Sequence, residues 1–115
     1  MRTIIAGSRS ITDWDLVKEA IESCGWLPTT VLSGCARGVD QLGEQWAAVH
    51  NVPVERFPAD WEKHGRAAGH KRNLQMALHA HALIAVWDGE SPGTRGMLKI
   101  AQSKGLLTYT HLAIH

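Results

Sequence analysis

The sequence is poor in cysteine and contains no long apolar run. Its two cysteines, Cys24 and Cys35, form no CxxC pair and lie beside no secretory segment, which excludes a disulfide-built fold and indicates free thiols in a reducing compartment. We therefore expect a cytoplasmic protein. Nowhere do about 18 apolar residues run together, as a membrane-spanning helix requires, so no membrane partner is expected.

The chain also lacks an excess of charge of either sign. Twelve Lys and Arg residues stand against eleven Asp and Glu residues, a formal net charge of +1 at pH 7. This near balance removes any global attraction to nucleic acid or to an anionic membrane surface. Nucleic acid is therefore not an expected partner, and any anion site must be local.

Several motifs that would assign a chemistry are missing. The chain has no GxxxxGK[ST] phosphate loop, no GxGxxG dinucleotide fingerprint and no GxSxG nucleophile elbow. The histidines do not show metal-site spacing, because His79 and His81 would point to different faces of an expected helix, while His64 and His70 lie in or beside an expected loop. We expect no metal ion and no cofactor.

What is present is a regular alternation of elements in a chain of one-domain size. With 44% apolar and 20% charged residues, residues 1–115 have the composition of a single soluble globular domain. Stretches with helical spacing separate five short β-favouring runs, at residues 3–6, 30–32, 52–57, 83–87 and 106–110. This alternation predicts an α/β fold, a three-layer sandwich in which helices cover both faces of a five-stranded parallel sheet.

The composition of the runs predicts the strand order. The first and fourth runs are apolar without alternation, as in central strands buried on both faces. The third carries Pro53 and Glu55, and the fifth alternates through Thr108 and Thr110, as edge strands do. The order 3-2-1-4-5 satisfies these constraints. In such a sheet the ligand crevice lies beyond the carboxyl ends of the strands, between the first and the fourth.

Glycine and arginine occur together in three of the four loops at that edge. Glycine lets backbone N–H groups approach an anion, a helix start adds partial positive charge, and arginine adds a two-pronged donor, so the loops predict a phosphorylated, nucleotide-like ligand. Arg72 joins them if a long loop at residues 62–68 brings it over the sheet edge. The candidate ligand-binding residues of the loops are Gly7, Ser8, Arg9, Ser33, Gly34, Arg37, Gly38, Asp40, Asp60, Trp61, Trp87, Asp88, Gly93, Thr94 and Arg95.

Each of these residues also has a structural interpretation. A single glycine-rich turn is more often structural, and a single loop arginine is usually only solvated. Trp61 and Trp87 suit either a stacking platform for a nucleobase or packing in the core or a dimer interface. Asp60 and Asp88 suit either hydrogen bonds to ribose hydroxyl groups or helix capping and ion pairing.

Several of these motifs, in order along the chain, resemble those of a known family. They are Gly7-Ser8-Arg9, Ser33-Gly34-x-Ala36-Arg37-Gly38-Val39-Asp40, Phe57-Pro58-Ala59-Asp60-Trp61, His64-Gly65-x-Ala67-Ala68-Gly69-x-x-Arg72-Asn73-x-x-Met76 and Gly93-Thr94-Arg95. Together they resemble the YspA/cpYpsA-related branch of the SLOG superfamily, which is related to DprA and to the LOG phosphoribohydrolases. The resemblance implies a Rossmann-like fold that binds nucleotides or nucleotide-derived ligands, with Arg72 and Asn73 in the ligand pocket.

One departure from the LOG pattern bears on catalysis. LOG enzymes carry a PGGxGTxxE loop whose Glu takes part in glycosidic-bond cleavage, and the matching position here is Met97. A thioether neither ionises nor accepts a proton, so we expect binding rather than catalysis and assign no catalytic residue. Glu90, Asp88 or Asp60 could substitute for the missing carboxylate from another direction.

Three function classes remain open at this point. The leading hypothesis is a module that senses or sequesters a nucleotide-derived signal of the ADP-ribose or cyclic nucleotide type. The alternative is an N-glycosidase or phosphoribohydrolase acting on nucleoside monophosphates. Single-stranded nucleic-acid binding, by analogy with DprA, is disfavoured by the near-neutral charge. The resemblance to LOG proteins and the five tryptophans further predict a homodimer.

Overall fold

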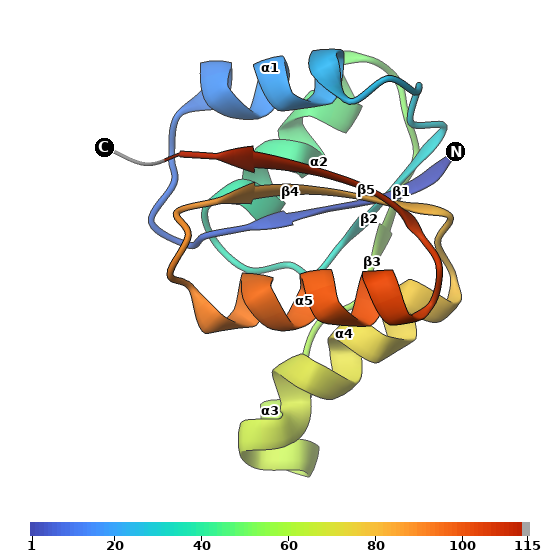
Figure 1. Cartoon of the computed structure of the whole chain (residues 1–115). Coiled ribbons are helices and arrows are strands. Elements are labelled where there is room, and N and C mark those ends of the chain that lie inside the picture. Colours follow the sequence, from blue (N-terminus) through green and yellow to red (C-terminus); the bar gives the residue numbers. More distant parts are fainter. Residues whose placement is uncertain (114–115) are drawn as a thin grey trace.

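The structure is a computed structural model that describes residues 1–113. Its sheet has the parallel order β3-β2-β1-β4-β5, which confirms the predicted fold class and strand order (Figure 1). The elements along the chain are β1 (Arg2–Gly7), α1 (Trp14–Ser23), β2 (Thr30–Ser33), α2 (Val39–Val49), β3 (Val54–Arg56), α3 (Trp61–His64), the 3₁₀ turn η1 (Gly65–Ala67), α4 (Ala68–Leu78), β4 (Ala82–Trp87), α5 (Pro92–Ser103) and β5 (Leu107–Leu112).

The two central strands are apolar without alternation because each feeds two separate cores. Ile5 of β1 and Ile84 of β4 pack under α1 and α2, whereas Ile4 and Leu83 pack under α4 and α5. All four side chains are fully buried. Successive residues of a strand point to opposite faces, so a strand covered on both sides must be apolar at every position. The result is a Rossmann-like three-layer sandwich.

The edge strands are shorter or shifted relative to the predicted runs. Pro53 precedes β3 and its carbonyl accepts a hydrogen bond from the Val31 N–H (2.9 Å), while the donor that proline lacks is not needed at an edge. The ladder therefore begins at Val54 rather than at residue 52. At the other edge, β5 continues beyond residue 110 to Leu112, because it stays paired with β4 as far as Trp87.

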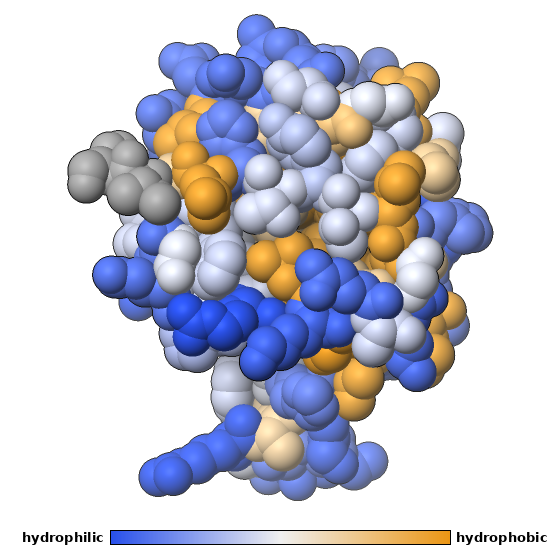
Figure 2. All heavy atoms as spheres, viewed as in Figure 1, coloured by the Kyte–Doolittle hydropathy of each residue, from blue (hydrophilic) through white to orange (hydrophobic). Residues whose placement is uncertain are grey.

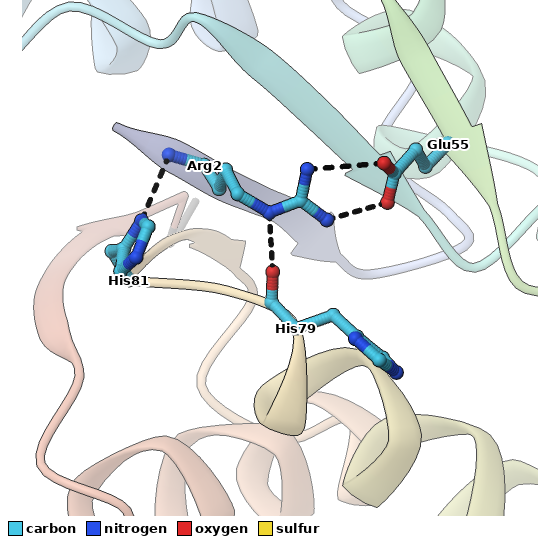
Figure 3. A network of polar contacts seen from close by, with 4 residues as sticks. All are labelled: Arg2, Glu55, His79 and His81. Atoms are coloured by element: carbon cyan, nitrogen blue, oxygen red, sulfur yellow. Dashed lines mark hydrogen bonds and ion pairs between the residues drawn. The ribbon is translucent and has the colours of Figure 1, made fainter.

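A polar network ties the amino end of the sheet together (Figure 3). Arg2 of β1 donates from both terminal nitrogens to Glu55 of β3 (3.0 and 2.6 Å) and from Nε to the carbonyl of His79 (2.7 Å). The backbone N–H of Arg2 meets Nδ1 of His81 at 3.4 Å. One side chain thus joins a central strand, an edge strand and the end of α4.

The predicted loop at residues 62–68 is helical instead, and this prediction was wrong. Asp60 accepts a hydrogen bond from the Lys63 N–H (3.1 Å) and so begins α3, after which η1 leads directly into α4. No residue of α3 is buried. Figure 1 shows α3 projecting from the body of the sandwich, beyond α4. Within residues 1–113, no helix is both long and apolar enough to cross a membrane.

Candidate functional site

A large cavity lies at the carboxyl edge of the sheet, where the strand order reverses between β1 and β4. Its volume is about 940 Å³, at the upper end of the usual range for small-molecule sites. The loop after β1, the starts of α2 and α5, and the segment from α3 to α4 form its walls. The lining residues are Ala6, Gly7, Arg9, Ser10, Thr12, Ala36, Arg37, Asp40, Trp61, Arg66, Gly69, His70, Arg72, Asn73, Met76, Ser91, Pro92, Gly93, Thr94, Gly96 and Met97.

The cavity brings together part of the predicted site. The predicted residues in its lining are Gly7, Arg9, Arg37, Asp40, Trp61, Arg72, Asn73, Gly93 and Thr94. Gly34 lines a smaller hollow of about 150 Å³, which shares Arg9, Ala36, Trp61 and Arg72 with the main cavity. The predicted residues outside both linings are Ser8, Ser33, Gly38, Asp60, Trp87, Asp88 and Arg95.

Positive charge dominates the cavity wall. Arg9, Arg37, Arg66 and Arg72 line it, and Asp40 is the carboxylate that the described lining residues supply. The protein as a whole is almost neutral, so this concentration is a local property of the cavity. Four arginines beside the one carboxylate of the described lining favour an anionic ligand. In Figure 2, which colours hydropathy and not charge, strongly hydrophilic side chains gather over the first part of α5 and on the projecting α3.

Hydrogen bonds within the wall fix the position of Arg72. Its Nε donates to Oδ1 of Asn73 (2.8 Å), and its Nη1 donates to the carbonyl of Gly34. Burial lowers the pKa of this guanidinium, against the attraction of Asp40. A Cβ atom at Gly34 would lie 2.5 Å from Nη1 of Arg72 and 2.9 Å from Oδ2 of Asp40. Glycine at this position therefore allows both charged groups to approach the loop after β2.

Asp40 is a nearly buried carboxylate in the first turn of α2, with 6% of its surface exposed. Its Oδ2 accepts a hydrogen bond from the Ala36 N–H (3.2 Å). Burial raises the pKa of Asp40 from 3.8 to about 6, although that hydrogen bond and the positive charges of Arg72 and Arg9 oppose the rise. Part of the Asp40 population is therefore protonated near neutral pH.

Hydrogen bonds to the Asp88 carboxylate hold the loop before α5 in place. Its Oδ1 accepts hydrogen bonds from the N–H groups of Glu90 (2.9 Å) and Ser91 (2.8 Å), and its Oδ2 accepts one from the Ser91 hydroxyl (2.8 Å). These bonds lower the pKa of Asp88 to about 2. Ser8 completes the arrangement, because its hydroxyl accepts from the Asp88 N–H (3.0 Å). Asp88 and Ser8 thus hold Ser91, which lines the cavity, although neither lies in the lining itself.

The start of α5 leaves room for a ligand. Pro92 is the first helical residue, and within residues 1–113 no side chain caps this helix by a hydrogen bond. A Cβ atom added to Gly93 or Gly96 would have no heavy atom of another part of the chain within 4 Å. The uncapped N–H groups and the helix dipole make this wall attractive to an anion.

The two candidate stacking tryptophans occupy different environments. Trp61 lines both the cavity and the smaller hollow, and 52% of its surface is exposed. Trp87 packs on the core beside α5, where its Nε1 donates to the carbonyl of Ser91 (3.1 Å) and the guanidinium of Arg95 lies 5.6 Å from its ring centre. Only the environment of Trp61 resembles the predicted stacking platform.

The other predicted residues outside the linings have structural contacts. Asp60 caps α3, the second of the two roles that its sequence position suggested. Ser33 is buried, donates to Glu44 (2.6 Å) and accepts from the Cys35 N–H (3.1 Å). Gly38 has a φ of 78°, and a Cβ there would lie 2.6 Å from the carbonyl oxygens of Ser8 and Arg9. Glycine at residue 38 therefore lets two loops of the site touch.

Sequence reasoning missed several polar lining residues: Ser10, Thr12, Arg66, His70 and Ser91. Arg66 and His70 occupy unspecified positions of the His64–Met76 motif, so the family resemblance gave no signal for them beyond their nearness to Arg72 and Asn73. They were missed because residues 62–68 were expected to form a loop. The helical path through η1 into α4 is what carries both side chains to the cavity.

The carboxylates proposed as substitutes for the missing LOG glutamate do not reach the cavity. Glu90, Asp88 and Asp60 all lie outside its described lining, whereas Met97 lines it as a buried side chain. The acid that the cavity does contain is Asp40. Across residues 1–113, no group of three or more His, Cys, Asp or Glu side chains is placed to hold a metal ion.

Comparisons with known proteins identify the family of the chain. The family model described as YspA, cpYpsA-related SLOG family matches residues 1–64, which run from β1 to α3. The Gene 61 protein of Mycobacterium phage D29 is 35% identical over a 115-residue alignment that covers 91% of each chain. No solved structure matches. The resemblance found in the sequence is confirmed, and the chain belongs to the YspA, cpYpsA-related SLOG family.

Proposed function

We propose that the protein binds a nucleotide or nucleotide-derived signal, of the ADP-ribose or cyclic nucleotide type, as a sensor or a sequestering protein. The observation that carries this proposal is the charge of the cavity: Arg9, Arg37, Arg66 and Arg72 line one hollow with the single described carboxylate of Asp40. Family membership supports a nucleotide-related ligand at a coarser level.

The geometry supports binding through the phosphate part of such a ligand. Arginine presents a planar pair of donors that matches two phosphate oxygens, and the uncapped start of α5 adds backbone donors on the same wall. Trp61 offers an exposed aromatic face for a base. The cavity thus combines the two kinds of contact that a nucleotide uses.

A panel of nucleotides tests the proposal by thermal unfolding. A ligand at a hundredfold excess over its dissociation constant adds about 2.7 kcal/mol to the free energy of unfolding. In a domain near this size, each kcal/mol raises the melting midpoint by about 4–8 °C. We expect at least one nucleotide or ADP-ribose derivative to produce such a shift. A panel without any shift would refute the proposal.

A second candidate function, N-glycosidase activity on nucleoside monophosphates, is favoured by one observation. Asp40 lies in the cavity wall with a pKa raised by burial to about 6, so its protonated form is available to donate to a leaving base while water attacks the anomeric carbon. Chromatography of the ligand after incubation separates the two functions. Intact ligand supports binding alone, whereas released base that disappears in Asp40→Asn supports hydrolysis.

We further propose a homodimer in the cytoplasm that does not bind nucleic acid. Two free cysteines suit a reducing compartment. Large apolar side chains at the surface offer material for a subunit contact; they are Leu27, Val49, Leu78, Leu107 and Leu112. Light scattering over a wide concentration range is expected to give twice the chain mass, and oligonucleotides are expected to produce no salt-dependent shift. A monomer mass throughout would contradict the dimer.

A further inference from the structure

The two edge strands of the sheet are protected to different degrees. β3 is three residues long, follows Pro53 and carries Glu55 and Arg56. Short length, proline and charge are features by which edge strands avoid pairing with other chains. β5 is six residues long, keeps an unbroken register with β4 from Leu107 to Leu112, and contains no proline and no Asp, Glu, Lys or Arg. The β5 edge therefore has none of these protections.

Hydrogen bonds to β4 show which residues of β5 point away from the sheet. The Leu107 N–H donates to the carbonyl of His81 (3.1 Å), and the Ala113 N–H donates to the carbonyl of Trp87 (2.8 Å). The backbone N–H and C=O groups of successive strand residues point to opposite sides, so every second residue from 107 to 113 bonds to β4. The residues whose groups point outward are Thr108, Thr110 and Leu112. Within residues 1–113 these outward groups have no hydrogen-bond partner.

Few of the side chains along this edge are strongly polar. Leu107 and Leu112, at the two ends of the strand, are 47% and 53% exposed. In Figure 2, pale and orange side chains form a band across the molecule where β5 runs in Figure 1, with more hydrophilic side chains above and below the band. Because β5 contains no Asp, Glu, Lys or Arg, two such strands can meet without repulsion between like charges.

A second copy of β5, placed antiparallel about a two-fold axis, matches this edge. The axis stands perpendicular to the sheet, so outward residues of one copy pair with outward residues of the other. With the axis at Thr110, the two Thr110 residues lie opposite each other, and Thr108 lies opposite the partner's Leu112. All the outward residues then exchange backbone bonds with the partner, about six hydrogen bonds in total. An axis at Tyr109 would instead place Leu112 opposite residue 106, before the strand begins.

The same register covers the exposed leucines. Leu112 lies beside the partner's Thr108, and Leu107 lies opposite the partner's Ala113. On the same face as Leu107, Tyr109 lies opposite the partner's His111. Cross-strand pairs that include aromatic and apolar side chains stabilise neighbouring strands. The pairing therefore satisfies the backbone groups and removes apolar surface from water at the same time.

From this arrangement we propose that β5 is the subunit contact of the protein. Two copies pair their β5 strands antiparallel about an axis at Thr110, and their two five-stranded sheets join into one. This inference rests on the proposed homodimer and names the surface that forms it. The paired strands run in opposite directions, so the two cavities, at the carboxyl ends of the strands, lie at opposite sides of the joined sheet.

Opposite charges at residue 110 test the contact. Thr110→Lys and Thr110→Asp each place two like charges across the axis, while the ladder with β4 is kept because the backbone groups of residue 110 point outward. We expect each variant alone to raise the dissociation constant of the dimer by about tenfold or more in sedimentation equilibrium. An equimolar mixture of the two variants should restore dimers with one chain of each kind. The matched control is Gln45→Lys, on the exposed surface of α2, which should dimerise like the unmodified protein.

The outcomes separate this inference from the proposed homodimer. A monomer mass of the unmodified protein at every concentration would overturn both, and would leave the proposed nucleotide site untouched. Dimers in both single variants, as strong as in the unmodified protein, would overturn the β5 contact and leave the homodimer on another surface. A mixture that stays monomeric, with both variants folded by their melting midpoints, would overturn the axis at Thr110.

Amide hydrogen exchange on the unmodified protein gives a readout that needs no variant. The amides of Thr108, Thr110 and Leu112 have no described partner in the single chain, so they should exchange quickly at dilutions where the protein is a monomer. At concentrations where light scattering gives the dimer mass, we expect them to exchange more slowly by about tenfold or more. The amides of Tyr109 and His111, which face β4, should exchange slowly at both concentrations. Unchanged exchange of the outward amides in the dimer would overturn the inference.

Discussion

Arginine is used differently at the two ends of the sheet. At the amino end, Arg2 donates to both oxygens of Glu55 and to the carbonyl of His79, so its donors are engaged inside the protein (Figure 3). At the carboxyl end, Arg9 and Arg37 line the cavity as exposed side chains, and within residues 1–113 neither forms an ion pair or a side-chain hydrogen bond. The paired arginine at the amino end contributes to the fold, whereas the side-chain donors of Arg9 and Arg37 at the carboxyl end are free to bind an anion of the proposed kind.

The carboxylates repeat this contrast. Glu55 at the amino end faces Arg2, whose hydrogen bonds lower the pKa of the Glu55 carboxyl. Asp40 at the carboxyl end is buried, and burial raises its pKa despite the nearby arginines. An arrangement selected for stability alone would not bury a charged group in this way. The ionised form of Asp40 therefore costs stability in the cavity wall, whereas the ionised form of Glu55 is favoured by its partner.

The largest expected effect is on the pH dependence of stability. Asp40 has a pKa of about 6 in the folded protein and an ordinary value of 3.8, so the folded protein holds the proton more tightly than the unfolded chain. The free energy of unfolding should fall as pH rises from about 4 to about 6 and then level off, by on the order of 3 kcal/mol from this group. Urea unfolding at several pH values measures this fall in the free energy of unfolding.

Two variants sharpen this measurement. Asp40→Asn should remove the fall between pH 4 and 6, and should be more stable than the unmodified protein at pH 7. Asp88→Asn is the control of opposite sign. The pKa of the Asp88 carboxyl is lowered to about 2, so the unmodified protein has stability from Asp88 that is lost as pH falls below about 4. A profile between pH 4 and 6 that is identical with and without Asp40→Asn would contradict the assigned cause.

The next effect concerns affinity at the carboxyl end. Arg9→Ala should weaken binding of a nucleotide identified in the panel by about 1.5–3 kcal/mol, the range for a hydrogen bond to a charged group. The affinity of Arg9→Lys should lie between that of the unmodified protein and that of Arg9→Ala, because lysine keeps the charge and loses the planar pair of donors. Arg9→Lys should leave the melting midpoint of the free protein unchanged, and Arg9→Ala should lower it only slightly near neutral pH, because Arg9 has no described side-chain hydrogen bond and only its attraction to ionised Asp40 is lost. Calorimetric titration decides the point, and unchanged affinity would remove Arg9 from the site.

At the amino end the same kind of change should act on stability alone. Arg2→Ala removes the paired bonds to Glu55 and the bond to His79, and should lower the melting midpoint by a few degrees. Exposure of both partners keeps the effect modest. Ligand affinity should stay unchanged, because this network lies at the opposite end of the strands from the cavity. Weakened binding in Arg2→Ala would break the division of roles between the two ends.

The sequence predicted which strands and loops meet at the site better than it predicted which side chains line the cavity. Strand order followed from local composition, because Pro53 and Glu55 tolerate only an edge and Ile4 and Ile5 need cover on both faces. The strand order also determines which loops share the carboxyl edge. Where a loop side chain points depends on contacts that the pattern does not show. Asp88, for example, turns inward to Glu90 and Ser91, and so leaves the cavity lining.

The smallest expected effect comes from Arg95, which the sequence grouped with Arg9 and Arg37. In the structure its guanidinium lies over the Trp87 ring, and its Nη2 donates weakly to the carbonyl of Gly89 (3.4 Å). Arg95 is exposed over the half-buried Trp87 ring, and a cation–π contact of an exposed cation contributes about 0.5–1 kcal/mol at most. Arg95→Ala should therefore lower the melting midpoint by less than Arg2→Ala does. Its effect on ligand affinity should be below threefold, because the side chain lies outside the cavity lining. The informative measurement is a titration of Arg9→Ala and Arg95→Ala side by side with the same nucleotide. Equal losses in the two variants would show that the bound ligand draws Arg95 off the tryptophan and into the anion site, and the boundary between the cavity and its surroundings would then move to include the whole first turn of α5.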